Sequence, residues 1–334
     1  MTGEALLHET SICIERTFSM DNDVTLDRRT LLRGVAALGG MLALPALSVA
    51  TEQSSSSAVA QSAEPTTLRD VPLSPAAKLT IERRGAIVLI GFNRPYIQNR
   101  VDPETFTALA KAYYEYDNDP SLRAAVLFGH GDNFSRGIDV DAFAELARSQ
   151  KPLVSGPGYI DPLAKGQRLS KPLIAVVHGD TWNLGHELNL VADIRIAAAN
   201  TRYGQDENTH GRFPGSGSTI RFVHEVGWGN AMRYMLTGDH WTAEDSYRMG
   251  EAQEVLPTPQ AALDRAVEIA NKIAACGPLG IKMTLTSAHL VIDPVQADAL
   301  MKLDEQYGAL YHTQDFLEGR RAEAEGRKPV YVGK

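Results

Sequence analysis

The sequence predicts an α/β fold in which helices cover the strands. Two observations predict it: short apolar runs alternate with longer segments of helical spacing, and nearly the whole pattern after Pro257 is helical. The chain has 334 residues, of which 43% are apolar and 22% charged, as in ordinary globular proteins. We expect four parts, at residues 1–50, 51–76, 77–256 and 257–334.

Residues 1–50 have the order of an export signal. Arg28 and Arg29 precede a stretch of 17 residues, 34–50, that carries no charge and ends in small residues suited to cleavage before Thr51. The paired arginines predict a Tat-type signal, and therefore a periplasmic or exported protein that uses the Tat machinery. A retained membrane anchor on a cytoplasmic protein is the alternative, because about 17 apolar residues can just span a bilayer. Translation could start at Met1 or Met20.

The next segment, 51–76, is rich in Ser, Ala, Gln and Pro, which is typical of a flexible linker. Beyond it, four apolar runs are the predicted strands: 86–92, 124–128, 173–177 and 194–198. Asp102 is a good N-cap for a helix over 103–116. In the C-terminal region we expect helices over 261–275, 279–291 and 294–313, with a break at Pro294.

Charge and cysteine content exclude several classes. There are 33 Lys and Arg against 41 Asp and Glu, a net charge of −8, with no basic run, so we expect no nucleic-acid partner. Cys13 and Cys276 are far apart and belong to no C-x-x-C pattern, and Cys276 is expected to be a small buried residue. His186-Glu187 begins a zinc-binding His-Glu-x-x-His pattern, but Leu190 occupies its last position, so no metal site is predicted.

Two segments, 133–140 and 171–194, are predicted strand ends that turn into helix starts. A helix N-terminus presents unpaired backbone N–H groups and a positive dipole end, so two of them together would stabilise a developing negative charge. This arrangement is an oxyanion hole. Glu187 lies in the second segment, and Glu207 follows 20 residues later on a turn-rich stretch.

An ordered series of segments extends over some 250 residues: Asn93-Arg94-Pro95 with Asn99, then 134–139, then 171–194, and finally 315–330. In this series the chain, from about Leu79 to Lys334, resembles the enoyl-CoA hydratase/isomerase, or crotonase, superfamily. The resemblance implies an α/β, crotonase-like (ClpP/crotonase) spiral of ββα turns with a helical C-terminal region that assembles a homotrimer or hexamer. It also implies an acyl-CoA substrate, and no bound cofactor beyond the coenzyme A of that substrate.

The resemblance also implies roles for individual residues. Glu187 would activate water, and Glu207 would exchange a proton with the substrate's α-carbon. The Ile138 and Leu184 N–H groups would form the oxyanion hole. Two further sets follow. Residues expected to contact substrate are Arg136, Gly137, Asp139 and Trp182. Residues expected to support the two carboxylates are His186, His210 and Asp206.

Two positions depart from the family's pattern. Asn183-Leu184-Gly185 stands where three glycines are usual, and Ile138 where Ala or Gly is usual. A backbone N–H survives replacement of its side chain, and one such donor contributes about 3–4 kcal/mol, so we expect an oxyanion hole of altered shape. Arg136 adds a charge to a segment that is usually made of small residues.

Three functions follow, in order of preference. The first is an enoyl-CoA hydratase or isomerase. The second, favoured by export because coenzyme A is cytoplasmic, is a CoA-independent hydrolase of a β-diketone-like substrate that would use His186, His210 and Asp193. The third is a non-catalytic exported binding protein.

Overall fold

A six-stranded sheet forms the centre of the fold. The computed structural model describes residues 77–149, 153–154 and 156–334, so the predicted leader and linker lie outside the described residues. The sheet order is β1-β2-β3-β4-β6-β9, and every neighbouring pair is parallel except β1 with β2. Its strands are β1 (Leu79–Arg84), β2 (Ile87–Phe92), β3 (Ala124–Gly129), β4 (Leu173–Val177), β6 (Ile194–Ala198) and β9 (Glu254–Leu256). All four strand predictions are confirmed.

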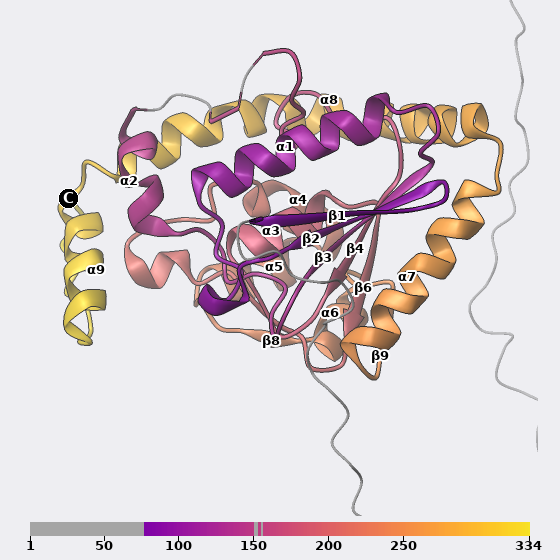
Figure 1. Cartoon of the computed structure of the whole chain (residues 1–334). Helices are drawn as coiled ribbons and strands as arrows, with labels where there is room; N and C mark the ends of the chain where they lie inside the picture. Colours follow the sequence, from indigo (N-terminus) through magenta and orange to yellow (C-terminus); the bar gives the residue numbers. More distant parts are fainter. Residues whose placement is uncertain (1–76, 150–152, 155) are drawn as a thin grey trace, which may run out of the picture. The chain divides into compact units, whose positions relative to one another are not determined.

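The central strands are buried on both faces, which explains their uninterrupted apolar sequences. Side chains of β2 alternate between two cores: Val88 and Ile90 pack with α1 (Pro103–Asn118) and α3 (Leu184–Val191), whereas Ile87 and Leu89 pack with α7 (Pro259–Ala274). Figure 1 shows these helices around the fan of strands. Helix α1 confirms the helix predicted at 103–116, and the Asp102 side chain caps it by accepting from the Thr105 N–H at 2.8 Å.

The described residues also form a second sheet, of three strands. Its order is β5-β7-β8, from β5 (Asp180–Trp182), β7 (Arg202–Gly204) and β8 (Trp241–Thr242). The remaining elements are the 3₁₀ turns η1 (Pro95–Ile97) and η2 (Glu207–His210), and the helices α2 (Val140–Ser149), α4 (Ser218–Val226), α5 (Trp228–Met235), α6 (Ala243–Met249), α8 (Pro278–Leu310) and α9 (Gln314–Glu325).

The break predicted at Pro294 is wrong, because α8 runs through this proline as one helix of 33 residues. A proline inside a helix removes one hydrogen bond and costs about 3 kcal/mol. Burial of Leu300 and Leu303 and an ion pair of 2.8 Å between Arg168 and Asp293 offset that cost on either side of it.

The expectation that Cys276 is buried is also wrong. It is exposed, because it lies on the surface in the short connection between α7 and α8. No helix among the described residues is both long and apolar enough to cross a membrane.

Candidate active site

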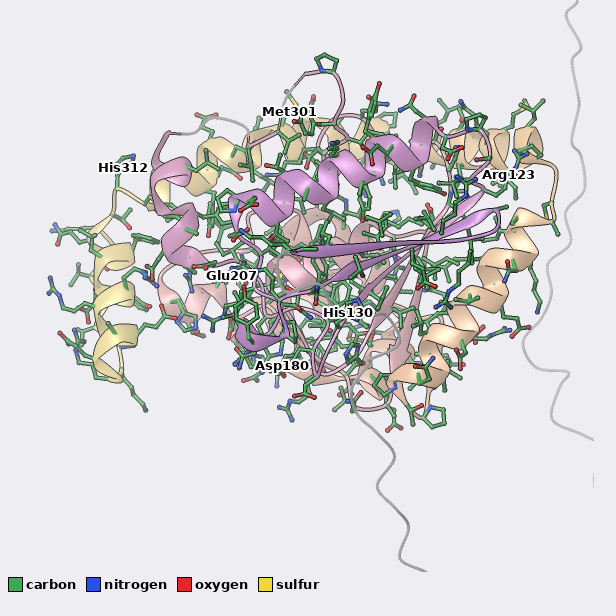
Figure 2. All side chains as sticks on the ribbon, in the orientation of Figure 1. Arg123, His130, Asp180, Glu207, Met301 and His312 are labelled. Carbon is green, nitrogen blue, oxygen red and sulfur yellow. The ribbon has the colours of Figure 1, made fainter. Side chains whose placement is uncertain are left out.

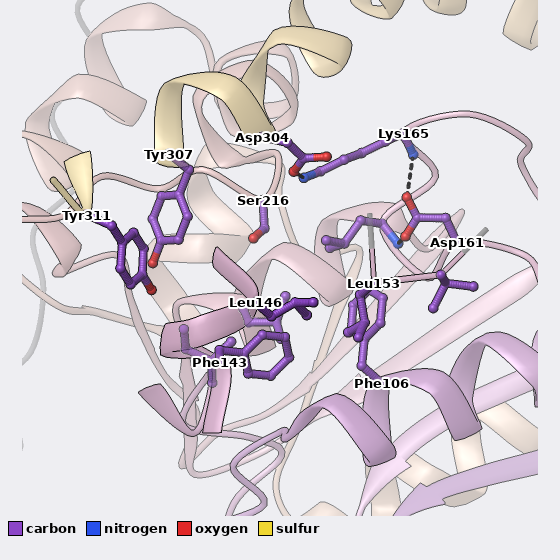
Figure 3. Close-up of a pocket in the computed structure, with 14 residues that line it drawn as sticks. Phe106, Phe143, Leu146, Leu153, Asp161, Lys165, Ser216, Asp304, Tyr307 and Tyr311 are labelled. Carbon is purple, nitrogen blue, oxygen red and sulfur yellow. Dashed lines mark hydrogen bonds and ion pairs between the residues drawn. The ribbon is translucent and has the colours of Figure 1, made fainter. Parts of the chain in front are cut away.

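Two adjoining chambers lie at the start of α3. Both are lined by Ile138, Leu184, Ser216 and Tyr307. The first, of about 150 Å³, is mainly apolar, and Figure 3 shows Phe106, Phe143, Leu146 and Leu153 in its wall with the rings of Tyr307 and Tyr311. We call it the apolar chamber. The second, of about 400 Å³, contains the carboxylates of Glu187 and Glu207 and several cations, and we call it the polar chamber.

The Ile138 and Leu184 N–H groups lie where the loop after β3 meets the N-terminus of α3. Gly137 has a φ of +91°, a region that favours glycine, and a Cβ atom there would lie 3.0 Å from the Asn183 Cβ and 3.5 Å from the Leu184 N. The two segments are therefore in direct contact. Neither N–H donates a hydrogen bond to any described residue, so both are available to a ligand oxygen.

Asn183 forms the turn that places the Leu184 N–H. Its φ of 51° and ψ of −121° are unusual for a residue with a side chain, and it occupies one of the positions that the family's pattern gives to glycine. Its side chain is held by Asp206: Asn183 Nδ2 donates to Asp206 Oδ1 at 2.9 Å, and the Asp206 N–H donates to Asn183 Oδ1 at 3.1 Å. This pair of hydrogen bonds stabilises a turn that glycine would adopt freely.

Glu187 is a buried carboxylate in the first turn of α3. Its Oε1 accepts from the backbone N–H groups of Ser216 at 2.8 Å and Ser218 at 3.2 Å. Burial raises the pKa of Glu187 above its ordinary value, and these two hydrogen bonds, which favour the charged form, reduce that rise without reversing it. Glu187 therefore has one oxygen held in place.

Glu207 begins η2, and its Oε2 is buried without a partner among the described residues. Burial raises the pKa of Glu207 well above its ordinary range, and the negative charge of Glu187 raises it further. Both carboxyl groups therefore have raised pKa values, and that of Glu207 is raised further, so Glu187 is the first of the two to lose its proton and Glu207 the one that keeps it longer.

The predicted substrate-contacting residues divide into two groups. Arg136 and Trp182 line the polar chamber, where the Arg136 Cζ lies 4.0 Å from the centre of the Trp182 ring and its Nε pairs with Asp180 at 3.3 Å. Gly137 follows Arg136 in the chain, and its positive φ sets the course of the backbone there. Asp139 lines neither chamber, and its carboxylate lies 3.5 Å from the Ala142 N–H at the start of α2.

The predicted supporting residues also divide. Asp206 and His210 line the polar chamber, with 3.8 Å between the Asp206 Oδ2 and the His210 Nε2. Burial raises the pKa of Asp206, but His210, His240 and Asn183 together lower it well below its usual range. His186 lies outside both chambers, fully buried between Glu251 at 2.6 Å and Gln205 at 2.7 Å.

The set His186, His210 and Asp193 does not come together. Asp193 accepts from the Leu173 N–H at 2.8 Å and lines a different cavity, away from His210. Among the described residues no group of three or more His, Cys, Asp or Glu side chains could hold a metal ion.

The model of the enoyl-CoA hydratase/isomerase family matches residues 82–334. The chain belongs to this family. The enoyl-CoA hydratase EchA19 of Mycobacterium tuberculosis is 36% identical to it over 254 residues, which cover 75% of this chain and 95% of that protein. The short-chain-enoyl-CoA hydratase of Clostridium acetobutylicum is 30% identical over 74% of this chain and 95% of its own.

Solved structures of the family have the same fold. A probable enoyl-CoA hydratase/isomerase from Mycobacterium abscessus is 38% identical with a TM-score of 0.63, and a carnitinyl-CoA hydratase from Mycobacterium avium is 29% identical with a TM-score of 0.70. Each comparison covers 77% of this chain and 99% of the other. The predicted family, fold class and hydratase-like enzyme are confirmed, and neither the diketone hydrolase nor the binding protein is favoured.

Three residues of this site were not identified from the sequence. His240 packs against Trp182 in a tilted arrangement with 4.3 Å between ring centroids, Tyr307 comes from α8, and Arg212 follows η2. No sequence pattern marks His240 or Tyr307, because only the fold brings them to Glu207. Arg212, five residues after Glu207, was within reach of sequence reasoning as a cation beside a predicted catalytic carboxylate.

Proposed function

We propose that the enzyme adds water reversibly across the conjugated double bond of an enoyl-CoA thioester. One observation carries this proposal: two buried carboxyl groups whose pKa values are raised to different extents line the same chamber as two unpaired backbone N–H groups. The Ile138 and Leu184 N–H groups would bind the thioester oxygen and stabilise the enolate that forms when water attacks.

In this mechanism the two carboxyl groups take opposite roles. Glu187, which loses its proton first, accepts a proton from the attacking water, and Glu207, whose pKa is raised further, delivers a proton to the α-carbon. The apolar chamber, which shares Ile138 and Leu184 with the polar one, would hold the acyl chain. Asp206 acts at a distance, through Asn183, on the position of the Leu184 N–H.

Glu187→Gln and Glu207→Gln test the assignment. Each is expected to lower the turnover of a short enoyl-CoA by at least about 10²-fold while ligand binding is largely kept. Loss of absorbance of the conjugated thioester measures the rate, and titration with the substrate measures binding. Glu244→Gln, an exposed carboxylate on α6, is the matched control. Unchanged turnover in both site variants would refute these roles.

We also propose that the enzyme is a homotrimer or a dimer of trimers. Helix α8 supports this, because it exposes large apolar side chains that a monomer would leave in water. Figure 2 labels one of them, Met301. The others on this helix include Leu279, Met283, Leu290, Val291 and Val295. Light scattering gives the mass directly, and a monomer at micromolar concentration would contradict the proposal.

We propose, from the sequence alone, that residues 1–50 direct export through the Tat pathway. A reporter fused after Ala50 should reach the periplasm in a bacterial host, and Arg28→Lys together with Arg29→Lys should retain it in the cytoplasm. Export of the reporter by the double variant would refute a twin-arginine signal.

A further inference from the structure

The polar chamber contains a buried cation without a partner. Arg212 lies in the loop after η2, lines this chamber and is only 7% exposed. Its Nε and Nη1 atoms have no hydrogen-bond partner among the described residues, and no carboxylate oxygen of those residues lies within 4.0 Å of its guanidinium nitrogens. Burial of an unpaired charge is costly, so such a group calls for a ligand.

The other arginines and lysines of the two chambers differ from Arg212: Arg100 is exposed to solvent, and the remaining two have partners. Arg136 pairs with Asp180 and covers the Trp182 ring, and in the apolar chamber Lys165 Nζ pairs with Asp304 at 2.5 Å. Those charges are already compensated within the chain. Arg212 is therefore the buried cation of this site that is left for an anion from outside.

The backbone around Arg212 is fixed close to the reacting groups. The Arg212 N–H donates to the Glu207 carbonyl at 2.9 Å, and the preceding Gly211 packs so tightly on α9 that a Cβ atom would lie 2.6 Å from the Asp315 carbonyl oxygen. Arg212, Glu207 and Tyr307 line the polar chamber together. Glu207 Oε2 is likewise unpartnered, and the two groups form no ion pair with each other.

We propose that Arg212 binds a carboxylate carried by the acyl group of the substrate, close to the double bond that is hydrated. This inference rests on the proposed function and names its substrate class: the CoA mono-thioester of an unsaturated dicarboxylic acid. A guanidinium presents two parallel N–H donors that match a carboxylate, and it remains charged at any working pH. A hydrocarbon substituent of the same acid would occupy the apolar chamber.

The test compares two thioesters of similar size, fumaryl mono-CoA and its methyl ester. They differ by one methyl group and by the negative charge of the free carboxylate. The wild-type enzyme is expected to favour the free acid by at least about tenfold in kcat/KM. Arg212→Gln should abolish this preference, mainly by raising KM for the free acid, and Arg212→Lys should keep part of it.

Three controls distinguish an effect of the Arg212 charge from misfolding and from contact with a phosphate of coenzyme A. Arg233→Gln removes an exposed arginine on α5 and should behave as the wild type, and thermal unfolding checks that each variant folds. A second pair of thioesters on N-acetylcysteamine, which lacks phosphates, should retain the preference for the acid.

Three results would overturn the proposal. They are no preference in the wild type, an equal loss for both thioesters in Arg212→Gln, and an Arg212 effect that disappears with the phosphate-free thioesters, which would assign the arginine to a phosphate of coenzyme A. If no enoyl thioester at all is hydrated, the proposed function fails instead. Hydration of the methyl ester with no preference for the acid removes this inference alone.

Discussion

Asn183 offers a sharp test of how the oxyanion hole is positioned. Asn183→Ala removes both hydrogen bonds to Asp206 while it keeps a Cβ atom at a φ of 51°. The bond to the Asp206 carboxylate is worth about 1.5–3 kcal/mol and the bond from its N–H about 1 kcal/mol, so the turn loses about 2.5–4 kcal/mol. Asn183→Gly loses the same bonds but relieves backbone strain of about 1–3 kcal/mol.

The two variants should therefore rank in an unusual order. If half of the free energy lost in Asn183→Ala is lost as transition-state stabilisation by the Leu184 N–H, kcat falls by about 10–30-fold, since 1.4 kcal/mol corresponds to tenfold. Asn183→Gly, although the smaller side chain, should retain a higher kcat and a higher melting temperature. The assay is hydration of a short enoyl-CoA followed by absorbance, together with thermal unfolding. Equal activity, or more activity in Asn183→Ala, would refute the idea that this side chain replaces a glycine by being held at Asp206.

Three further predictions concern charge and the helix break. The negative charge of Glu187 helps to raise the pKa of Glu207, so Glu187→Gln should lower it, and a carboxyl infrared titration that finds no decrease would contradict this coupling. Burial raises the pKa of Glu251, but His186, Trp241 and Ser246 together outweigh it and the net pKa is lowered. This carboxylate therefore stabilises the fold above its unfolded pKa of about 4.3 and loses that effect as pH falls through its folded pKa. Glu251→Gln should accordingly cost about 3–5 kcal/mol of unfolding free energy at pH 7 and less at pH 4, as measured by urea unfolding, and an equal loss at both pH values would argue against the ion pair. Pro294→Ala should stabilise α8 by up to about 3 kcal/mol in thermal unfolding, and a lower melting temperature would mean that the proline is needed where it stands.

Local pattern sufficed for the four central strands of the large sheet, but not for its edge strands β1 and β9 or for the site. The strand at 173–177 could be predicted, because a strand buried on both faces must be apolar throughout. The unbroken helix α8 could not be predicted, because Pro294 locally favours a break, and only the folded structure shows that Leu300 and Leu303 are buried. Glu187 and Glu207 were identified from a resemblance that spans the whole fold. The position of His186 was out of reach, because its partner Glu251 comes 65 residues later.

Ile138 and Leu184 show how this enzyme can differ from its relatives without losing the family's chemistry. Both residues contribute a backbone N–H to the proposed oxyanion hole, and that donor is independent of the side chain. Both residues line the two chambers, where in the proposed mechanism the reacting carbons would meet the rest of the acyl group. Larger residues here would therefore leave the charge stabilisation intact and change which acyl groups fit. Arg212 would favour a charged group, which the apolar wall would exclude. The shape of the two chambers and the charge of Arg212 would together select the substrate.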